Sequence, residues 1–201
     1  MPYGIAGDLL KSDVSAGYGN IYSSRYENMI QRLDPRNHIN SMSIEGGVDV
    51  LLCETIFDTL NAKAALYAAD EACAATGRDV PVMLSFTIAD KQGRILSGQT
   101  IEAFLASVAG RNLLSVGLNC SFGAREMKPF LKRLSEIAPC YVSVYPNAGL
   151  PDAMGKYSET PEKMAAHVAP FIQEGLVNII GGCCGTTPEH ICAIEKMVSE
   201  S

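Results

Sequence analysis

The sequence contains no hydrophobic run that approaches the ~20 residues a membrane-spanning helix needs. Its first residues, MPYGIAGD, lack the basic start and the apolar core of a secretory signal. Acidic residues outnumber basic ones by 22 to 16, so the composition provides no positive surface for nucleic acid or for an anionic membrane. From these absences we expect a cytoplasmic protein that binds neither nucleic acid nor membrane.

Two glycine-rich phosphate-binding patterns are also missing. The chain has neither GxGxxG nor GxxxxGK followed by serine or threonine, the marks of dinucleotide- and nucleotide-binding loops. The sequence does contain enough apolar residues, 47% of 201, for one sizeable core. It also contains seven cysteines. In a reducing compartment, clustered cysteines indicate metal binding or catalysis before they indicate a disulfide framework.

From about residue 43 onward, strand-like and helix-like segments alternate. Near-continuous apolar segments, typical of strands buried on both faces, recur at intervals of roughly 30 residues, the length of a βα unit. The expected strands cover residues 48–54, 80–87, 114–120, 140–145 and 177–181. The expected helices cover residues 60–75, 101–109, 125–138, 160–175 and 188–198. The pattern predicts an α/β protein with a parallel sheet covered by helices.

Polar residues at the carboxyl ends of these strands help to choose between a doubly wound sheet and a barrel. They are Glu54, Thr87, Cys120, Asn147, Cys183 and Cys184. Active sites of both architectures form at that end, but a doubly wound sheet would want the missing phosphate loop. We therefore predict a partial (β/α)8 TIM barrel of about five βα units, corresponding to strands 4–8 of the complete fold. Such a barrel would leave two strand edges unpaired.

The most unusual stretch is residues 181–188, GGCCGTTP, which follows the fifth expected strand. Its two adjacent cysteines, Cys183 and Cys184, lie among glycines that allow the backbone to come close to another group. Cys120 lies in the same position after the third strand. Three cysteines at two strand ends predict one shared metal ion. Zinc is the expected metal, because it prefers thiolates in tetrahedral geometry, and a catalytic zinc keeps one position for water or substrate.

The charge of such a site predicts its chemistry. Three thiolates around Zn²⁺ give the site a net negative charge, which makes the metal a poor activator of water. A free thiol is mostly protonated at neutral pH, whereas a metal-bound thiol is deprotonated. The surplus negative charge keeps a bound sulfur nucleophilic. The predicted site therefore suits alkylation of a substrate thiol and suits hydrolysis poorly.

Two further residues at strand ends are candidates for substrate binding. Glu54 closes an apolar strand, where it could anchor a substrate ammonium group or could be a structural acid with satisfied partners. Asn147 ends the strand that separates Cys120 from the adjacent cysteine pair. It could occupy the open metal position when no substrate is bound.

Purely structural roles for the cysteines are the alternative to metal binding. Cys183 and Cys184 could be small buried side chains, or they could form a strained disulfide, which a reducing compartment disfavours. His190 is expected to be a surface or capping residue rather than a ligand. Four more cysteines fall within strand or helix patterns and are expected in the core: Cys53, Cys73, Cys140 and Cys192.

The motifs around the three cysteines resemble the homocysteine S-methyltransferase family. They are GLNC at residues 117–120 and GGCCGTTP at residues 181–188. Three more segments resemble the homocysteine-binding module of cobalamin-dependent methionine synthases in particular: ETIFDTLNAKA at 54–64, LSGQT at 96–100 and PNAGLP at 146–151. The resemblance covers roughly residues 43–201. We therefore expect an irregular N-terminal segment without family resemblance at residues 1–42, followed by a barrel portion at residues 43–201.

The resemblance implies a zinc-bearing barrel whose metal is held by Cys120, Cys183 and Cys184, with Glu54 as the acid that binds the amino group of homocysteine. It implies methyl transfer to the homocysteine thiolate to form methionine, with methylcobalamin as the donor. The expected partners are homocysteine and the cobalamin- and folate-binding modules of a full-length enzyme. The family's N-terminal Asp-Gly segment is not found here. A catalytically silent truncated barrel that only binds zinc is therefore an alternative, as is a methyltransferase that uses S-methylmethionine or S-adenosylmethionine.

Overall fold

A computed structural model describes residues 39–200 of the chain. In that range five strands form one sheet in the order β1-β2-β3-β4-β5, and every neighbouring pair is parallel. The strands are β1 (Leu51–Ile56), β2 (Val82–Phe86), β3 (Leu113–Gly123), β4 (Tyr141–Asn147) and β5 (Ile179–Ile180). The helices are α4 (Ile39–Glu45), α5 (Thr59–Thr76), α6 (Ile101–Ser107), α7 (Ala124–Ile137), α8 (Pro161–Gln173) and α9 (Pro188–Ser199). The predicted α/β fold with a partial barrel is confirmed.

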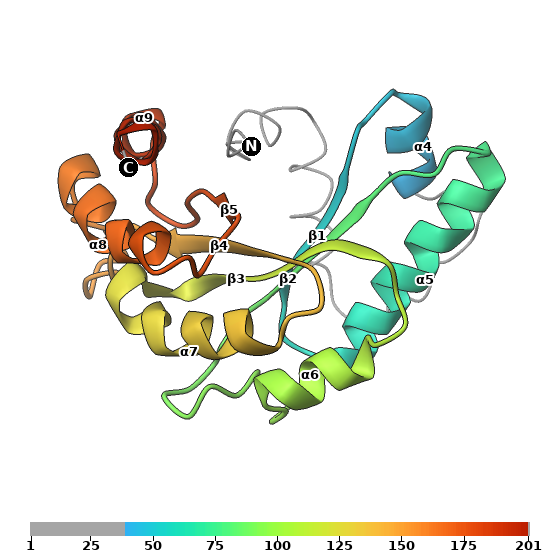
Figure 1. The fold of residues 1–201 in the computed structure, drawn as a ribbon, viewed down its shortest axis with the longest axis horizontal. Helices are drawn as coiled ribbons and strands as arrows, with labels where there is room; N and C mark the ends of the chain where they lie inside the picture. The colour runs from blue at the N-terminus through green and yellow to red at the C-terminus, as the bar shows by residue number, and fades with distance from the viewer. Residues whose placement is uncertain (1–38, 201) are drawn as a thin grey trace.

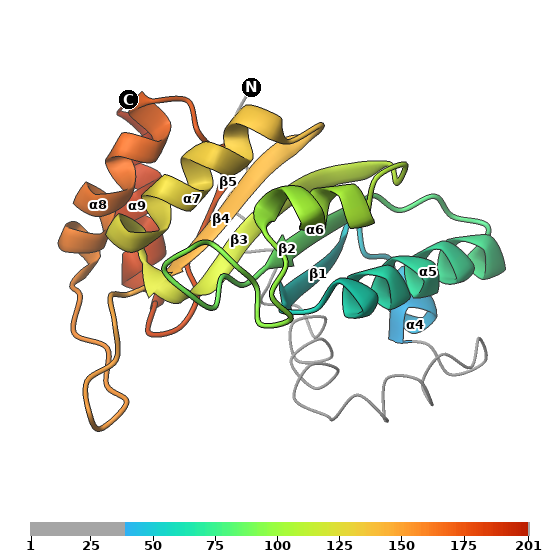
Figure 2. The same cartoon turned by 90° about the horizontal axis from the view of Figure 1, so that it is seen from below.

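The sheet is curved, and the helices lie along its outer side. Figure 1 shows α5, α6, α7 and α8 in a row around this side, and α9 packs on α8 at the end of the row. Figure 2, turned by 90°, shows the strands side by side in chain order. No helix among residues 39–200 is long and apolar enough to cross a membrane. This arrangement is a segment of a (β/α)8 barrel rather than a sheet with helices on both faces.

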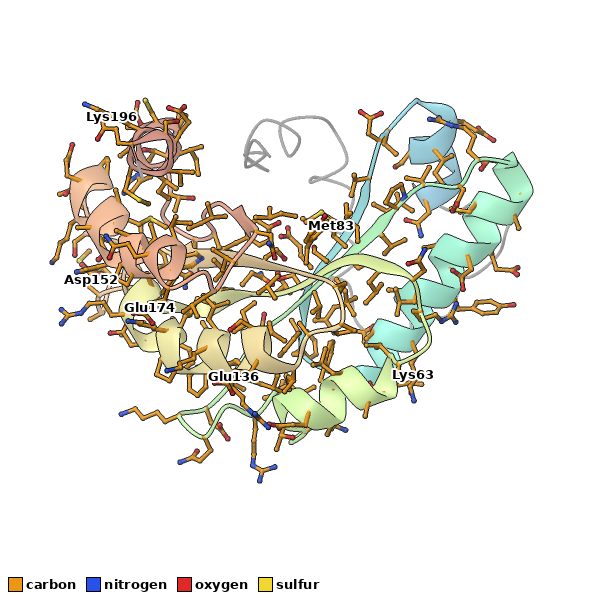
Figure 3. All side chains as sticks on the ribbon, in the orientation of Figure 1. Lys63, Met83, Glu136, Asp152, Glu174 and Lys196 are labelled. Atoms are coloured by element: carbon orange, nitrogen blue, oxygen red, sulfur yellow. The ribbon has the colours of Figure 1, made fainter. Side chains whose placement is uncertain are left out.

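The main core lies between the sheet and its helices, because successive side chains of a strand point to opposite faces. Cys53 is fully buried in this core, and the ring of Phe104 from α6 stacks on Phe86 of β2 at 4.1 Å. A smaller cluster on the inner face contains Leu52 and Met83, and Figure 3 shows Met83 on the side away from α6 and α7. The inner face of the sheet is thus separated from the main core.

The predicted cysteine burial is wrong for one residue. Cys73 and Cys140 are partly buried, but Cys192 is exposed. In α9 the buried residues are His190 and Ile194, one helical turn apart. Cys192 lies midway between them in the sequence and therefore on the opposite side of the helix. Since α9 packs on α8 at the end of the row, its outer side faces solvent.

The helix ends follow from local chemistry that the sequence indicates. Asp58 caps α5 by accepting hydrogen bonds from the backbone N–H groups of Leu60 and Asn61, at 2.8 and 3.0 Å. Gly77 ends the same helix with a φ of 68°. Thr100 caps α6, and its Oγ1 accepts from Ala103 N–H at 3.3 Å. The predicted domain boundary after residue 42 falls within α4, and residues 1–38 lie outside the described range.

The fifth strand is shorter than the sequence predicts, but its backbone pairing continues beyond the strand. The apolar pattern predicts a strand over residues 177–181, and β5 covers Ile179–Ile180. The N–H of Gly181 donates to the carbonyl of Val144 at 3.1 Å. The N–H of Cys183 donates to the carbonyl of Pro146 at 2.8 Å. This ladder carries the chain along β4 to the carboxyl end of the sheet.

Candidate metal centre

Cys120, Cys183 and Cys184 converge at the carboxyl end of the sheet. Cys120 lies in β3, the cysteine pair follows β5, and β4 lies between these strands. The Sγ atoms of Cys120 and Cys184 are 3.7 Å apart, and those of Cys183 and Cys184 are 3.9 Å apart. All three ligand atoms lie within 4.8 Å of one another. The two adjacent cysteines are free thiols rather than a disulfide, and neither is fully buried.

A distortion at the end of β3 places Cys120 in this cluster. Pairing with β4 advances four residues along β3, from Asn119 to Gly123, but only two residues along β4. Cys120 and Ser121 take left-handed φ values of 62° and 61°. This conformation costs a non-glycine residue about 1 kcal/mol or more. In a regular strand consecutive side chains point to opposite faces. The distortion allows both Asn119 and Cys120 to reach the cysteine pair.

The loop that carries the cysteine pair is attached to the end of β4. In addition to the bond from Cys183 to Pro146, the carbonyl of Cys184 accepts from the N–H of Ala148 at 2.9 Å. The N–H of Cys184 donates to Oδ1 of Asn147 at 3.1 Å. These three bonds fix the backbone of both cysteines to the end of β4, so the fold sets the Cβ positions from which both sulfurs extend.

Two glycines are needed because this loop packs tightly. A Cβ on Gly182 would lie 2.4 Å from Cγ2 of Thr186. Thr186 is held in that place, because its Oγ1 donates to the carbonyl of Cys183 at 2.6 Å. Gly185 has a φ of 80°, and a Cβ there would lie 2.4 Å from the Cβ of Tyr157. The close approach that the glycines of this stretch predict is therefore an approach of the loop to its own neighbours.

His190 caps α9 and does not belong to the group of residues that could hold a metal ion. Its Nδ1 accepts from the backbone N–H of Thr187 at 3.1 Å. Because Nδ1 is an acceptor, Nε2 carries the proton and donates to the carbonyl of Glu159 at 2.8 Å. The side chain is buried, and its contacts join the start of α9 to the segment before α8. His190 was expected to be either a surface residue or a capping residue, and it is a buried capping residue.

The spacing of the sulfurs fits a tetrahedral zinc ion. Zn–S bonds of about 2.3 Å at tetrahedral angles place two sulfur ligands about 3.8 Å apart. The two sulfur–sulfur distances here are 3.7 and 3.9 Å. Three thiolates are also the ligands that soft metals prefer. Cys120, Cys183 and Cys184 could therefore hold a metal ion.

As thiols, the three cysteines ionise unequally. A hydrogen bond from Cys183 lowers the pKa of the Cys120 thiol to about 5, and the N–H of Ser121 contributes. The same hydrogen bond, and then burial, raise the pKa of Cys183. Burial, and then the negative charge of Cys120, raise the pKa of Cys184. Three neighbouring thiols by themselves thus favour a single thiolate, and a divalent cation is what would allow all three to ionise.

The two candidate substrate residues both lie close to the cysteines. Glu54, in β1, is partly buried, and burial raises the pKa of its carboxyl, with the negative charge of Cys120 as a second cause. Asn147, at the end of β4, is 2% exposed. Its amide also favours the Cys120 thiolate, so Asn147 interacts with two of the three cysteines. Its Oδ1 accepts a hydrogen bond from the backbone N–H of Cys184.

One residue at this site carried no role in the sequence-based prediction. Asn119, fully buried in β3, contacts Thr55, Ser85 and Cys183. Its amide lies in an apolar strand immediately before Cys120. A buried amide needs hydrogen-bond partners, so its place in the strand was a usable signal. The identity of those partners depends on the tertiary structure.

The amino-acid sequence matches the profile of a known protein family. The sequence profile described as homocysteine S-methyltransferase matches residues 3–198. The chain belongs to the homocysteine S-methyltransferase family. The match begins well before residue 43, where the motif resemblance starts, and so includes a segment whose structure lies outside the described range.

A solved structure shows a similar fold. The apo form of the homocysteine methyltransferase MmuM from Escherichia coli is similar with a TM-score of 0.57 at 24% sequence identity. The similarity covers 77% of this chain and 51% of that one, so the chain spans about half the length of that protein. At this identity the likeness establishes the fold.

Proposed function

We propose that this chain is the zinc-bearing portion of a homocysteine methyltransferase barrel, with Cys120, Cys183 and Cys184 as the metal ligands. The observation that carries the proposal is the convergence of three sulfurs, two of whose separations match tetrahedral zinc, at the carboxyl end of a parallel sheet. Active sites of (β/α)8 barrels form at that end. Membership of the homocysteine S-methyltransferase family supports homocysteine as the methyl acceptor.

Different residues of the chain would bind the two ends of homocysteine, its thiol and its amino group. Zinc held by three thiolates would keep a substrate thiol deprotonated and nucleophilic at neutral pH. Glu54 would bind the ammonium group, since a partly buried carboxylate gains most from a positive partner. Asn147 would hold the Cys184 backbone and stabilise negative charge on Cys120. Because the thiol proton has left before methyl transfer, the chain needs to supply positioning rather than a general base.

Methylcobalamin, carried by a separate module, is the proposed methyl donor. The support is the resemblance of residues 54–64, 96–100 and 146–151 to methionine synthases. Homocysteine turnover with free methylcobalamin, S-methylmethionine or S-adenosylmethionine tests the donor. We expect methionine to form with methylcobalamin and not with the other two donors. Formation from only one of the other two donors would overturn this choice and leave the zinc site untouched.

Metal content tests the site directly. The wild-type chain is expected to hold about one zinc per chain, and Cys183→Ser is expected to hold little. Cys192→Ser is the matched control, because Cys192 is an exposed free cysteine in α9 and should leave the zinc content unchanged. Tight stoichiometric zinc in the Cys120→Ser, Cys183→Ser double variant would refute the proposal.

A second candidate is a chain that binds zinc but does not turn over by itself. Within residues 39–200, β1 and β5 each pair on one side only, and the chain spans 51% of the similar structure. A zinc-loaded chain that binds homocysteine but forms no methionine from any of the three donors would favour this candidate. Methionine formation by the isolated chain would exclude it.

A further inference from the structure

Asn119 connects three other segments of the chain through one buried amide. Its Oδ1 accepts from the Ser85 hydroxyl at 2.7 Å and from the Thr55 N–H at 3.0 Å. Its Nδ2 donates to Thr55 Oγ1 at 2.8 Å and to Cys183 Sγ at 3.9 Å. A primary amide has two N–H donors and two acceptor lone pairs, so these contacts use its full capacity. One side chain of β3 thus links β1, β2 and the cysteine loop.

The contact with Thr55 supports an unfavourable backbone conformation. Thr55 has a φ of 58°, which is an outlier for a β-branched residue. The pairing of β1 with β2 shifts register in the same place, between Cys53 and Ile56. Asn119 bonds both the N–H and the hydroxyl of Thr55. Glu54 is the neighbouring residue within this irregular part of β1, so the direction of its carboxyl depends on the backbone conformation that Asn119 supports.

The contact with Cys183 reaches the other end of the proposed homocysteine site. Residues that hydrogen-bond to a metal ligand orient it and tune its charge, and their loss typically costs about 10–100-fold in metal affinity or activity. The same NH₂ group serves both Thr55 Oγ1 and Cys183 Sγ. A movement at either contact would therefore alter the other.

We propose that Asn119 is a positioning residue that fixes Glu54 relative to the Cys183 sulfur, so that the amino group and the thiol of homocysteine are bound together. The inference rests on the proposed function, because it assigns homocysteine to these two ends. It predicts that Asn119 controls how strongly the site distinguishes homocysteine from a thiol without the amino group. A residue that only stabilised the fold would change both affinities equally.

Two variants separate the contacts of Asn119. Asn119→Asp keeps acceptor oxygens for Thr55 N–H and Ser85 but removes the donor that reaches Thr55 Oγ1 and Cys183. Thr55→Val keeps the side-chain shape and removes only the hydroxyl. The control is Ser115→Ala, a buried residue of β3 whose hydroxyl lies 3.5 Å from that of Ser143 and is not bonded to Asn119.

The measurements are the zinc dissociation constant, by competition with a chromophoric chelator, and calorimetric binding of two thiols to the zinc-loaded chain. The thiols are homocysteine and 4-mercaptobutanoate, which lacks the amino group. Asn119→Asp is expected to weaken zinc by about 10-fold or more and to reduce the preference for homocysteine by a similar factor. Thr55→Val is expected to reduce that preference and to weaken zinc less than Asn119→Asp does, because Asn119 keeps its own contact with Cys183. Ser115→Ala should alter neither.

An unchanged ratio of the two thiol affinities in folded Asn119→Asp would overturn the inference while the proposed function stands. If Asn119→Asp does not fold, an unchanged ratio in Thr55→Val overturns it on its own. A wild-type chain that binds neither zinc nor homocysteine would reject the proposed function itself, and the inference with it.

Discussion

Replacing Gly182 by alanine would test whether the tight packing of the cysteine loop shapes the metal centre. The added Cβ would lie 2.4 Å from Cγ2 of Thr186 and 2.9 Å from its Cβ and Oγ1, closer than the 3.0 Å below which Cβ contacts essentially do not occur. Thr186 would have to move. Its Oγ1 now donates to the carbonyl of Cys183 at 2.6 Å, and its N–H donates to the same carbonyl at 3.2 Å. The movement therefore disturbs the backbone of a proposed ligand.

The expected loss combines overpacking with a weakened hydrogen bond. Overpacking a well-packed site costs about 1–3 kcal/mol, and a lost hydrogen bond about 1 kcal/mol more. Gly182→Ala should therefore lower the free energy of unfolding by about 2–4 kcal/mol. In a chain of this size that corresponds to a fall in Tm of roughly 4–16 °C. Zinc affinity should fall as well, because Cys183 moves with its carbonyl.

Thermal unfolding and chelator competition on a double-mutant cycle measure both effects. The cycle compares wild type, Gly182→Ala, Thr186→Gly and the double variant. Because Thr186→Gly removes the three atoms nearest the new Cβ, Gly182→Ala should cost much less in that background. An unchanged Tm and zinc affinity in the single Gly182→Ala variant, or an equal cost in both backgrounds, would refute this account of the loop.

Three other substitutions test separate parts of the structure. Phe104→Ala should lower the free energy of unfolding by about 3–5 kcal/mol in urea titrations, because a fully buried ring stacked on Phe86 is lost. His190→Ala should cost about 2–4 kcal/mol by leaving two backbone groups unpaired, yet keep the zinc content of wild type; loss of zinc in a folded variant would contradict its capping role. Burial, and then the charge of Cys120, raise the pKa of Glu54, so this carboxyl contributes a downward slope of stability as pH rises through its raised pKa. Glu54→Gln should remove that slope and be more stable than wild type at about pH 8 but not at about pH 4, in urea titrations with a chelator present.

Much of the fold was predictable from local pattern. Alternating apolar and helical segments predicted each strand and helix from Leu51 onward, with differences of a few residues at the ends. The departures occur where long-range pairing overrides local composition. The strand expected at 177–181 has regular pairing only at Ile179–Ile180, and β3 continues through Cys120 to Gly123 in distorted form. The exposure of Cys192 depends on which element α9 packs against, and the sequence of α9 does not identify that element.

The residue types of the candidate site were also legible in the sequence, because thiols and glycines at strand ends carry a chemical meaning wherever they occur. Their distances were not, since Cys120 and Cys184 are 64 residues apart in the chain. The same separation divides Asn119 from both Thr55 and Cys183. The sequence by itself determined the order of strands and the set of possible ligands. Only the curvature of the sheet and the irregular ends of β1 and β3 decided which side chains meet, because those features arise from packing between segments and not within them.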